Sequence, residues 1–304
     1  MIKLDLPIDC MNYTQVIDSC INKMRKNNIL KITLKKRKYD LIEISKLYMK
    51  WGKSNELFKC LRLHNNQPIN MRNCYINDNQ ATNGMIKIYT IYFVKNRCGG
   101  FYDKIINNAK NPDIQCPFCG GINFPSELDH FLPKKSFSYY AIFPYNLIPI
   151  CKDCNQIYKR EFYPKNKNQQ LIHPYLDSEQ VFNEKWLYAK CIIDSTSLDL
   201  GMEEKLSVEF YVNPPSNWEE DKKEKVKFHF GKFNLAERFA VHSVSSLKTL
   251  LNQIKGYKSG NLPMQDAEKY LIDSDIEREK SPNSWKKALF EAVKKELPTI
   301  WSNI

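Results

Sequence analysis

The chain has 304 residues, of which 42% are hydrophobic and 12% aromatic, and this composition excludes global disorder and allows packed cores. No stretch approaches the roughly 18 consecutive apolar residues of a membrane span, and the charged start lacks the apolar run of a secretory signal, so we expect a cytoplasmic protein. The formal charge is +12, and residues 1–110 carry all of it, with 20 Lys and Arg against 8 Asp and Glu.

The basic segment at 1–112 is predicted to be mainly helical. In chain order, the apolar spacing first predicts a helix over Thr14–Lys26 capped by Thr14, then a short strand at Leu30, Ile32 and Leu34, and a helix over Leu41–Gly52 ending at the glycine. An Asn-rich loop is expected at 64–84. After it we expect a strand or buried helix over Met85–Lys95 and an amphipathic helix over Phe101–Pro112.

A basic run follows the predicted strand, and its members are Lys35, Lys36, Arg37 and Lys38. Basic segments of this density attract polyanions, so the run is a candidate nucleic-acid contact. The alternative is a solvated face in a chain that is simply rich in lysine. Against that alternative, the 194 residues after residue 110 are neutral overall.

The C-terminal region, 176–304, is predicted to contain a β-meander followed by helices. Alternating hydrophobicity predicts three strands, over Lys185–Ile193, Lys205–Val212 and Glu224–Phe233, and helical spacing returns from Asn234. We expect an α+β protein in three parts: 1–112, a core at 113–175 that carries the chemistry, and 176–304, a candidate partner-binding region.

Four of the ten cysteines form two CxxC pairs, Cys116 with Cys119 and Cys151 with Cys154. Two such pairs can hold one tetrahedral Zn²⁺ in a closed site, which stabilises the fold and does not catalyse. Four unrelated thiols and a redox CxxC are the alternatives, but the second has no βαβ context. The other six cysteines are scattered and are expected to be reduced thiols in or near cores.

The sequence around these pairs contains Asp129-His130, then Asn146-Leu147-Ile148-Pro149-Ile150-Cys151, then Cys154-Asn155 with Lys159 four residues later. This order over about 45–60 residues resembles the signature of the HNH (ββα-metal) nucleases. A longer form of the pattern, which runs on to His173-Pro174-Tyr175, more loosely resembles HNH proteins of antiphage defence loci, such as the Septu nuclease subunit. The chain departs from many members of the family in having Asn155 where they have histidine.

The resemblance implies a site residue by residue. It places Asp129-His130 on a β-hairpin and Asn155 on the helix that follows. Asp129 and Asn155 would then hold a catalytic Mg²⁺ or Mn²⁺, and the amide oxygen of Asn155 suits these hard cations better than imidazole does. His130 would act as the general base for the attacking water.

Other residues of the core are weaker candidates. Asn146 is expected to brace the loop and orient His130, or to be a plain turn former. Lys134, Lys135 and Lys159 are candidate phosphate contacts, and a solvated surface is the alternative for Lys134 and Lys135. His173 is expected to have a structural packing role.

The expected function is a metal-dependent DNA endonuclease, acting as a bacterial antiphage defence effector. The expected partners are DNA, an ATPase or other defence subunit and a second copy of the chain, with no membrane. The alternative from a different class is a catalytically inactive, zinc-stapled nucleic-acid-binding or adaptor module. The intact Asp129-His130 pair favours the enzyme, because an inactive descendant has no chemical need for either residue. An RNase or a toxin built on the same core is a third alternative.

Overall fold

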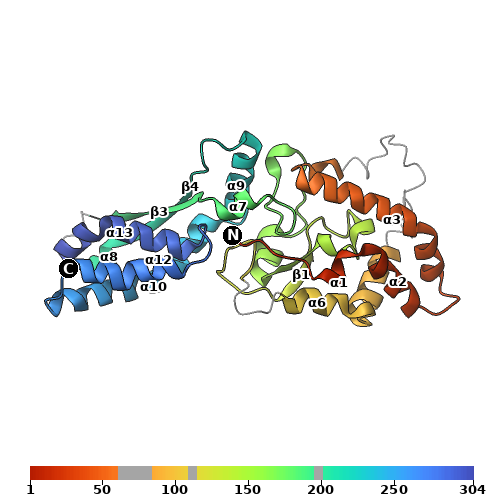
Figure 1. Cartoon of the computed structure of the whole chain (residues 1–304), viewed down its shortest axis with the longest axis horizontal. Helices are drawn as coiled ribbons and strands as arrows, with labels where there is room; N and C mark the ends of the chain where they lie inside the picture. Colours follow the sequence, from red (N-terminus) through yellow and green to blue (C-terminus); the bar gives the residue numbers. More distant parts are fainter. Residues whose placement is uncertain (61–83, 109–114, 195–200) are drawn as a thin grey trace. The chain divides into compact units, whose positions relative to one another are not determined.

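The structure is a computed structural model that describes residues 1–60, 84–108, 115–194 and 201–304. The chain divides into two compact units. The N-terminal unit comprises Ile2–Phe118 and Asn123–Ser178, and the C-terminal unit comprises Glu179–Ile304 with Met1 and Cys119–Ile122. Helices occupy both ends of the chain and two small antiparallel sheets lie between them in sequence, which confirms the α+β class (Figure 1). The three-part division at 112 and 175 stays a prediction.

The N-terminal unit is built of helices around one short hairpin. Its elements are α1 (Ile8–Met11), α2 (Tyr13–Lys23), α3 (Ile29–Lys53), η1 (Leu57–Lys59), η2 (Ile88–Lys95), η3 (Cys98–Gly100), α6 (Phe101–Asn108), β1 (Glu127–His130), η4 (Ser138–Tyr140), η5 (Pro144–Asn146), β2 (Leu147–Ile150), η6 (Cys154–Lys159) and η7 (Lys167–Gln169).

The predicted strand at Leu30, Ile32 and Leu34 is wrong, because these residues belong to the 25-residue helix α3. Buried positions in α3 recur at helical spacing along its whole length, at Leu34, Leu41, Ile44, Tyr48 and Trp51. The alternation that suggested a strand covered only five residues, and the longer period prevailed. The predicted helix over Leu41–Gly52 is the second half of α3, and the basic run lies on its first half.

Two other N-terminal predictions are refined. Helix α2 is capped by Asn12 and not by Thr14, since the Asn12 side chain accepts a hydrogen bond from the Gln15 backbone at 3.2 Å. Met85–Lys95 is helical, with Tyr89 and Phe93 buried. The predicted loop at 64–84 lies outside the described residues except for Gly84, and the predicted helix over Phe101–Pro112 is described only to Asn108.

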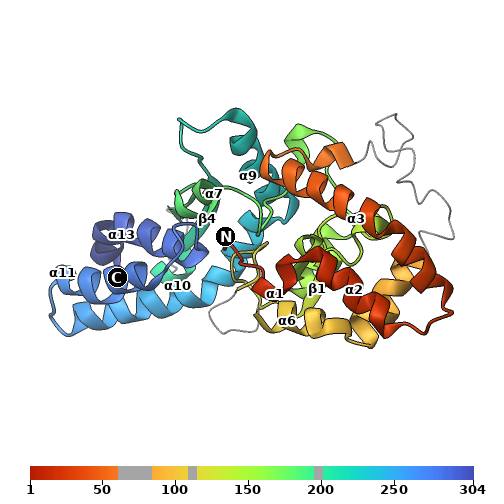
Figure 2. The same ribbon diagram turned by 45° about the vertical axis from the view of Figure 1, so that its right-hand side comes forward.

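The C-terminal unit contains a hairpin covered by long helices. Its elements are α7 (Glu179–Asn183), β3 (Leu187–Ile193), α8 (Met202–Lys205), β4 (Leu206–Val212), α9 (Glu220–Lys232), α10 (Leu235–Ser259), α11 (Met264–Ala267), η8 (Glu268–Asp273), α12 (Ser274–Arg278) and α13 (Trp285–Asn303). Helices α10 and α13 pack side by side, and each contacts the hairpin (Figure 2).

Two of the three predicted C-terminal strands are confirmed as β3 and β4, and their antiparallel register aligns Tyr188 with Tyr211. The third, over Glu224–Phe233, is wrong, because these residues lie in α9 and its C-cap. Val226, His229 and Phe233 are buried at i, i+3 and i+7, a helical spacing, and acidic residues fill the first turn, where they favour a helix N-terminus.

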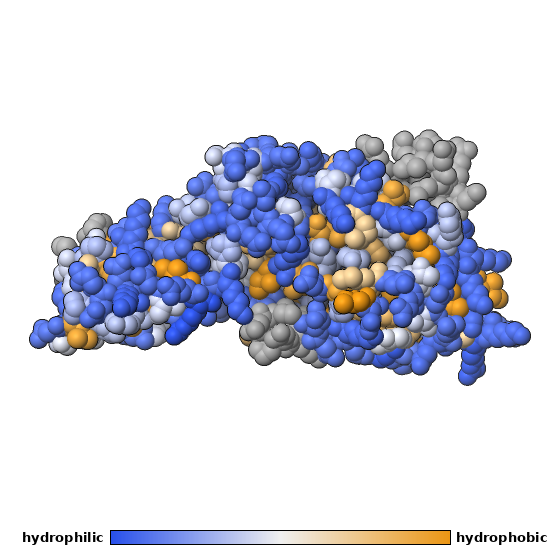
Figure 3. Space-filling view, viewed as in Figure 1, coloured by the Kyte–Doolittle hydropathy of each residue, from blue (hydrophilic) through white to orange (hydrophobic). Residues whose placement is uncertain are grey.

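Described cysteines outside the CxxC pairs are buried, except Cys191, which is half-buried, as expected of reduced core thiols. Cys74 lies outside the described residues. Among the described residues, no helix is both long and apolar enough to cross a membrane. Figure 3 shows hydrophobic groups over the N-terminal unit within a mostly hydrophilic face, and Ile8 and Met11 of α1 are among the exposed large hydrophobic residues.

Candidate active site

The hairpin β1–β2 presents Asp129 and His130 at the end of its first strand. The antiparallel register pairs Asp129 with Ile148 and His130 with Leu147. Side chains alternate along β1, so Glu127 and Asp129 share the half-buried face while Leu128 and His130 share the buried one. Asp129 and His130 therefore point to opposite faces of the hairpin.

The four cysteines of the CxxC pairs form one cluster. The Sγ atoms of Cys116, Cys119, Cys151 and Cys154 all lie within 4.8 Å of one another, and all four residues are buried. Gly120 has φ +58° and Gly121 φ +100°, so the knuckle after Cys119 uses left-handed backbone that glycine adopts without strain. Tetrahedral zinc with Zn–S bonds of about 2.3 Å needs sulfur atoms roughly 3.8 Å apart, so the donor set fits a structural zinc.

His130 lies in the interior of the N-terminal unit. Its Nε2 is 2.9 Å from the carbonyl oxygen of Ala141. A carbonyl oxygen only accepts, so Nε2 carries the hydrogen and Nδ1 keeps the lone pair of the neutral ring. Burial, together with the nearby charge of Lys134, lowers the pKa of His130 to about 3. The Tyr89 ring covers the imidazole edge-on, with 4.5 Å between ring centroids.

Lys159 contradicts the prediction that it touches phosphates. Its side chain is fully buried, with Nζ 2.5 Å from Asp129 Oδ2, and it donates a hydrogen bond of 2.8 Å to the His130 carbonyl. The ammonium of Lys159 is therefore bonded to groups of the protein itself and is not available to a phosphate in solvent. The buried ammonium instead balances the charge of Asp129 and fixes the end of β1.

Asn146 braces the loop between the two strands. Its Nδ2 donates to the carbonyl oxygens of Leu132 and Tyr140, and its Oδ1 accepts from the Leu132 backbone at 2.8 Å. The predicted bracing is therefore present in the structure. Asn146 was also expected to orient His130, but the described hydrogen bond of the His130 ring is to the Ala141 carbonyl.

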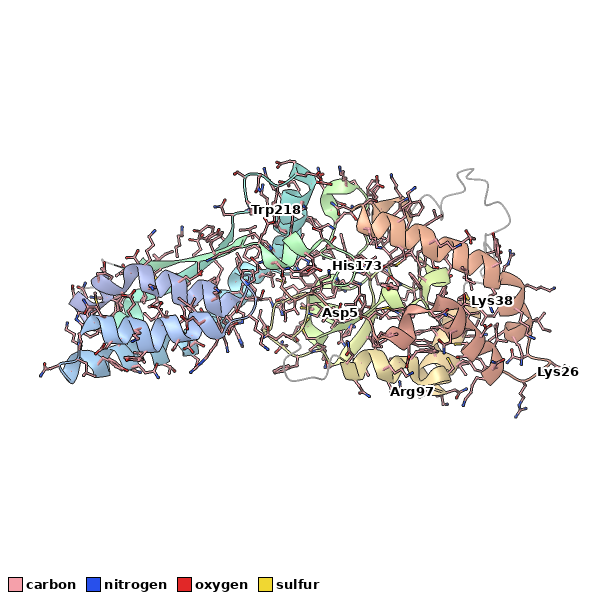
Figure 4. The ribbon with its side chains drawn as sticks, in the orientation of Figure 1. Asp5, Lys26, Lys38, Arg97, His173 and Trp218 are labelled. Carbon is pink, nitrogen blue, oxygen red and sulfur yellow. The ribbon has the colours of Figure 1, made fainter. Side chains whose placement is uncertain are left out.

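His173 has the structural role that was predicted for it. It is buried within the N-terminal unit (Figure 4), and its Nδ1 accepts from the Tyr175 backbone at 3.3 Å. Nε2 must then carry the hydrogen, which it donates to the Tyr48 hydroxyl at 3.0 Å. The Tyr48 hydroxyl in turn donates to Asn146 Oδ1 at 3.1 Å. This chain ties α3 to the loop of the hairpin.

Asn155 reaches the same strand from the helix after β2. It lies in η6, and its Nδ2 donates to Glu127 Oε2 at 2.7 Å. The hydrogen bond from Arg160 N to Asn155 O spans five residues, as in a π-helix. This wide turn places Asn155 and Lys159 toward β1, where they contact Glu127 and Asp129 respectively.

The remaining basic candidates differ in exposure. Lys134 is partly buried with its ammonium 5.1 Å from the centre of the Tyr89 ring, and Lys135 is exposed in an ion pair with Glu161. In the basic run, Lys35 and Lys36 are exposed. The other two members are paired, Arg37 with Asp40 at 3.1 Å and Lys38 with Asp18 at 2.5 Å. Figure 4 labels Lys38 among the helices of the N-terminal unit.

Sequence reasoning missed Glu127 and Tyr89. For Glu127 a signal was available, because a residue two positions before Asp129 on a predicted strand must share its face. Tyr89 carried no comparable signal, since it precedes the hairpin by some 40 residues and only folding brings it to His130.

Comparison with known proteins finds a similar curated protein and no matching family model. No family model matches the chain, and no solved structure matches it. Among curated proteins, the chain is similar to Protein ea31 of Escherichia phage lambda, with 23% identity over 309 residues that span 95% of this chain and 96% of the phage protein.

Proposed function

We propose that the chain is a metal-dependent HNH endonuclease that hydrolyses DNA phosphodiester bonds. One observation carries the proposal: β1 ends in Asp129 and His130, and the helix after β2 brings Asn155 to the same strand. Asn155 and Glu127 lie 28 positions apart in the chain, and η6 brings them into the hydrogen bond beside Asp129, while His130 lies on the other face of β1.

Oxygen donors on and beside β1 support a hard divalent cation in this proposal. The Asp129 side chain is 18% exposed, with Oδ2 buried beside Lys159, and the amide oxygen of Asn155 is directed away from Glu127. Oxygen donors of this kind favour Mg²⁺ and Mn²⁺ over softer ions. Such a cation, when bound, stabilises the negative charge that develops on a phosphodiester during hydrolysis.

His130 is the proposed general base. Because the Ala141 carbonyl holds the hydrogen on Nε2, Nδ1 is the atom that accepts the proton of the attacking water. The ring is only 2% exposed and Tyr89 covers it, so Tyr89 must shift before a water molecule reaches Nδ1.

The surrounding chain supplies the remaining parts of the proposal. The four-cysteine cluster would hold a structural zinc that fixes the hairpin and η6 to each other. The exposed lysines of the basic run would contact the DNA backbone. A role as an antiphage defence effector, with an ATPase or other subunit as partner, rests on the sequence resemblance alone and is proposed on that basis.

Plasmid nicking with Mg²⁺ or Mn²⁺, with EDTA as the control, tests the proposal. His130→Ala is expected to lower the cleavage rate by about 10²–10⁴, which is the usual contribution of a general base. Asp129→Asn is the better variant at its position, since it keeps the shape beside the buried Lys159. His242→Ala, at an exposed histidine of α10, is the matched control and should cleave as the wild type does.

Two outcomes would contradict the enzyme. Cleavage that survives unchanged in His130→Ala would remove the mechanism. A wild type that binds DNA and never cuts it, with either cation and with a partner present, would favour the binding-module alternative.

A further inference from the structure

Glu127 holds two amide side chains at once. Its Oε2 accepts from Asn155 Nδ2 and its Oε1 from Gln156 Nε2, each at 2.7 Å. Glu127 also shares the half-buried face of β1 with Asp129, two positions along. Both of its oxygens are therefore engaged by neighbouring residues of η6, directly beside the proposed cation ligands.

The carboxylate determines which way the Asn155 amide points. A carboxylate only accepts hydrogen bonds, so the NH₂ group of Asn155 must face Glu127 and Oδ1 must face away from it. An amide turned the other way would offer two hydrogens to a cation and no lone pair. The orientation of this one side chain thus decides whether Asn155 is a ligand.

We propose that Glu127 is a positioning residue that fixes the Asn155 amide with its oxygen toward the catalytic cation. The proposal rests on the proposed function, because it assigns a task at the same metal site. In this assignment Glu127 acts through Asn155 and not as a ligand, because each of its oxygens accepts a hydrogen bond from an amide, that of Asn155 or that of Gln156. Outer partners of this kind commonly contribute about 10–100-fold to metal affinity.

The test measures Mn²⁺ binding to the full, zinc-containing chain by electron paramagnetic resonance of free Mn²⁺, without DNA and without turnover. Glu127→Ala is compared with its parent in two backgrounds, the natural Asn155 and Asn155→Asp. An aspartate at 155 has two acceptor oxygens and needs no orientation. Gln156→Ala is the matched control, because it removes the other amide that Glu127 holds.

In the Asn155 background, Glu127→Ala is expected to weaken Mn²⁺ binding by about 10–100-fold. In the Asn155→Asp background it should weaken binding much less, since only the attraction of one nearby carboxylate for the cation is lost. Gln156→Ala should have the smaller effect. Zinc content and circular dichroism verify folding, and if Glu127→Ala fails to fold, Glu127→Gln is used in both backgrounds, with a smaller loss expected in the first.

An equal loss in both backgrounds would overturn the positioning role, because Glu127 would then act on the cation independently of the Asn155 amide, as a ligand or through its charge. An unchanged affinity in the Asn155 background would also overturn it. The proposed function fails differently: a wild type whose Mn²⁺ binding is absent, or is not removed by Asp129→Asn, has no such metal site, and both proposals fall together.

Discussion

Asp129 Oδ2 and Lys159 Nζ lie 2.5 Å apart, and the Lys159 side chain is completely buried while Asp129 remains partly exposed. The ammonium has no access to solvent and also donates to the His130 carbonyl. The charge of a proposed cation ligand is thus balanced from inside the protein. The same lysine secures the backbone of the residue proposed as general base.

Lys159→Met is therefore expected to destabilise the protein strongly. Loss of one partner from a buried ion pair costs about 3–5 kcal/mol, and the partial exposure of Asp129 places the expected cost near the lower end. Urea unfolding measures it. Adding Asp129→Asn to Lys159→Met should recover part of the lost free energy of unfolding, because the double variant has no carboxylate without its ammonium partner.

The matched control for that measurement is Lys135→Met, which breaks the exposed pair with Glu161. Exposed pairs contribute little, so this variant should unfold as the wild type does. If Lys159→Met were as stable as Lys135→Met, the ion pair with Asp129 would not be a structural element.

Zinc content is the second prediction. The purified chain should contain one zinc, and Cys116→Ser or Cys154→Ser should lose it and become insoluble, since each removes one of four ligands from a closed site. Metal analysis by mass spectrometry reads the content, and Cys191→Ser, outside the cluster, is the control. Well-folded protein without zinc would contradict the assignment.

The hydrogen-bond chain through Tyr48 gives a third prediction. Tyr48→Phe removes the hydroxyl that joins His173 Nε2 to Asn146 Oδ1 and leaves buried polar groups without that partner. The expected cost is about 1–3 kcal/mol of unfolding free energy. Tyr39→Phe, at an exposed tyrosine of the same helix, should have no effect. Equal stability of the two variants would mean that the hydroxyl does not brace the loop.

Much of the candidate site could be predicted from the sequence because the residues that form it are close together in the chain. Two CxxC pairs predict one four-cysteine cluster, and a short hairpin followed by a helix leaves few ways to place Asp129, His130 and Asn155. The contacts of Lys159 could not be predicted in the same way. From the sequence, a lysine four residues after Asn155 is expected to contact phosphate. In the structure, the wide turn of η6 directs its side chain into the core instead.

The errors in the fold have a common physical cause. At Leu30–Leu34 and at Glu224–Phe233, a short alternation agreed with a strand while the buried residues followed a helical period over a longer range. Alternation over four or five positions fits both periods, and tertiary packing decides between them. The strands β3 and β4 were predicted correctly because seven residues alternate in β4 against a paired neighbour.

Salt dependence of DNA binding gives a fourth prediction, on the basic run. Each phosphate contact contributes about 0.9 to the slope of log K against log salt concentration. Lys35→Ala with Lys36→Ala should flatten the slope more than Arg37→Ala with Lys38→Ala, because the latter two are engaged with Asp40 and Asp18. Fluorescence anisotropy over a salt series measures it. Identical slopes in the two double variants would mean that exposure on α3 does not decide the contact.

The last prediction concerns Asn155, where many HNH proteins, whose signature this sequence resembles, have histidine. Asn155→Ala should abolish cleavage, because it removes the amide oxygen and leaves Glu127 without its partner. Asn155→His should retain cleavage but change its metal preference. An imidazole can donate one N–H to Glu127, as Asn155 does now, and offer its other nitrogen to the cation.

Imidazole nitrogen suits Mn²⁺ and later transition metals better than Mg²⁺, so the ratio of Mn²⁺- to Mg²⁺-supported nicking should rise in Asn155→His relative to the wild type. The ratio is informative because a general loss of folding lowers both rates together and leaves it unchanged. An Asn155→His variant with the wild-type ratio would show that residue 155 does not contact the cation, and Asp129 would then have to hold it with other ligands.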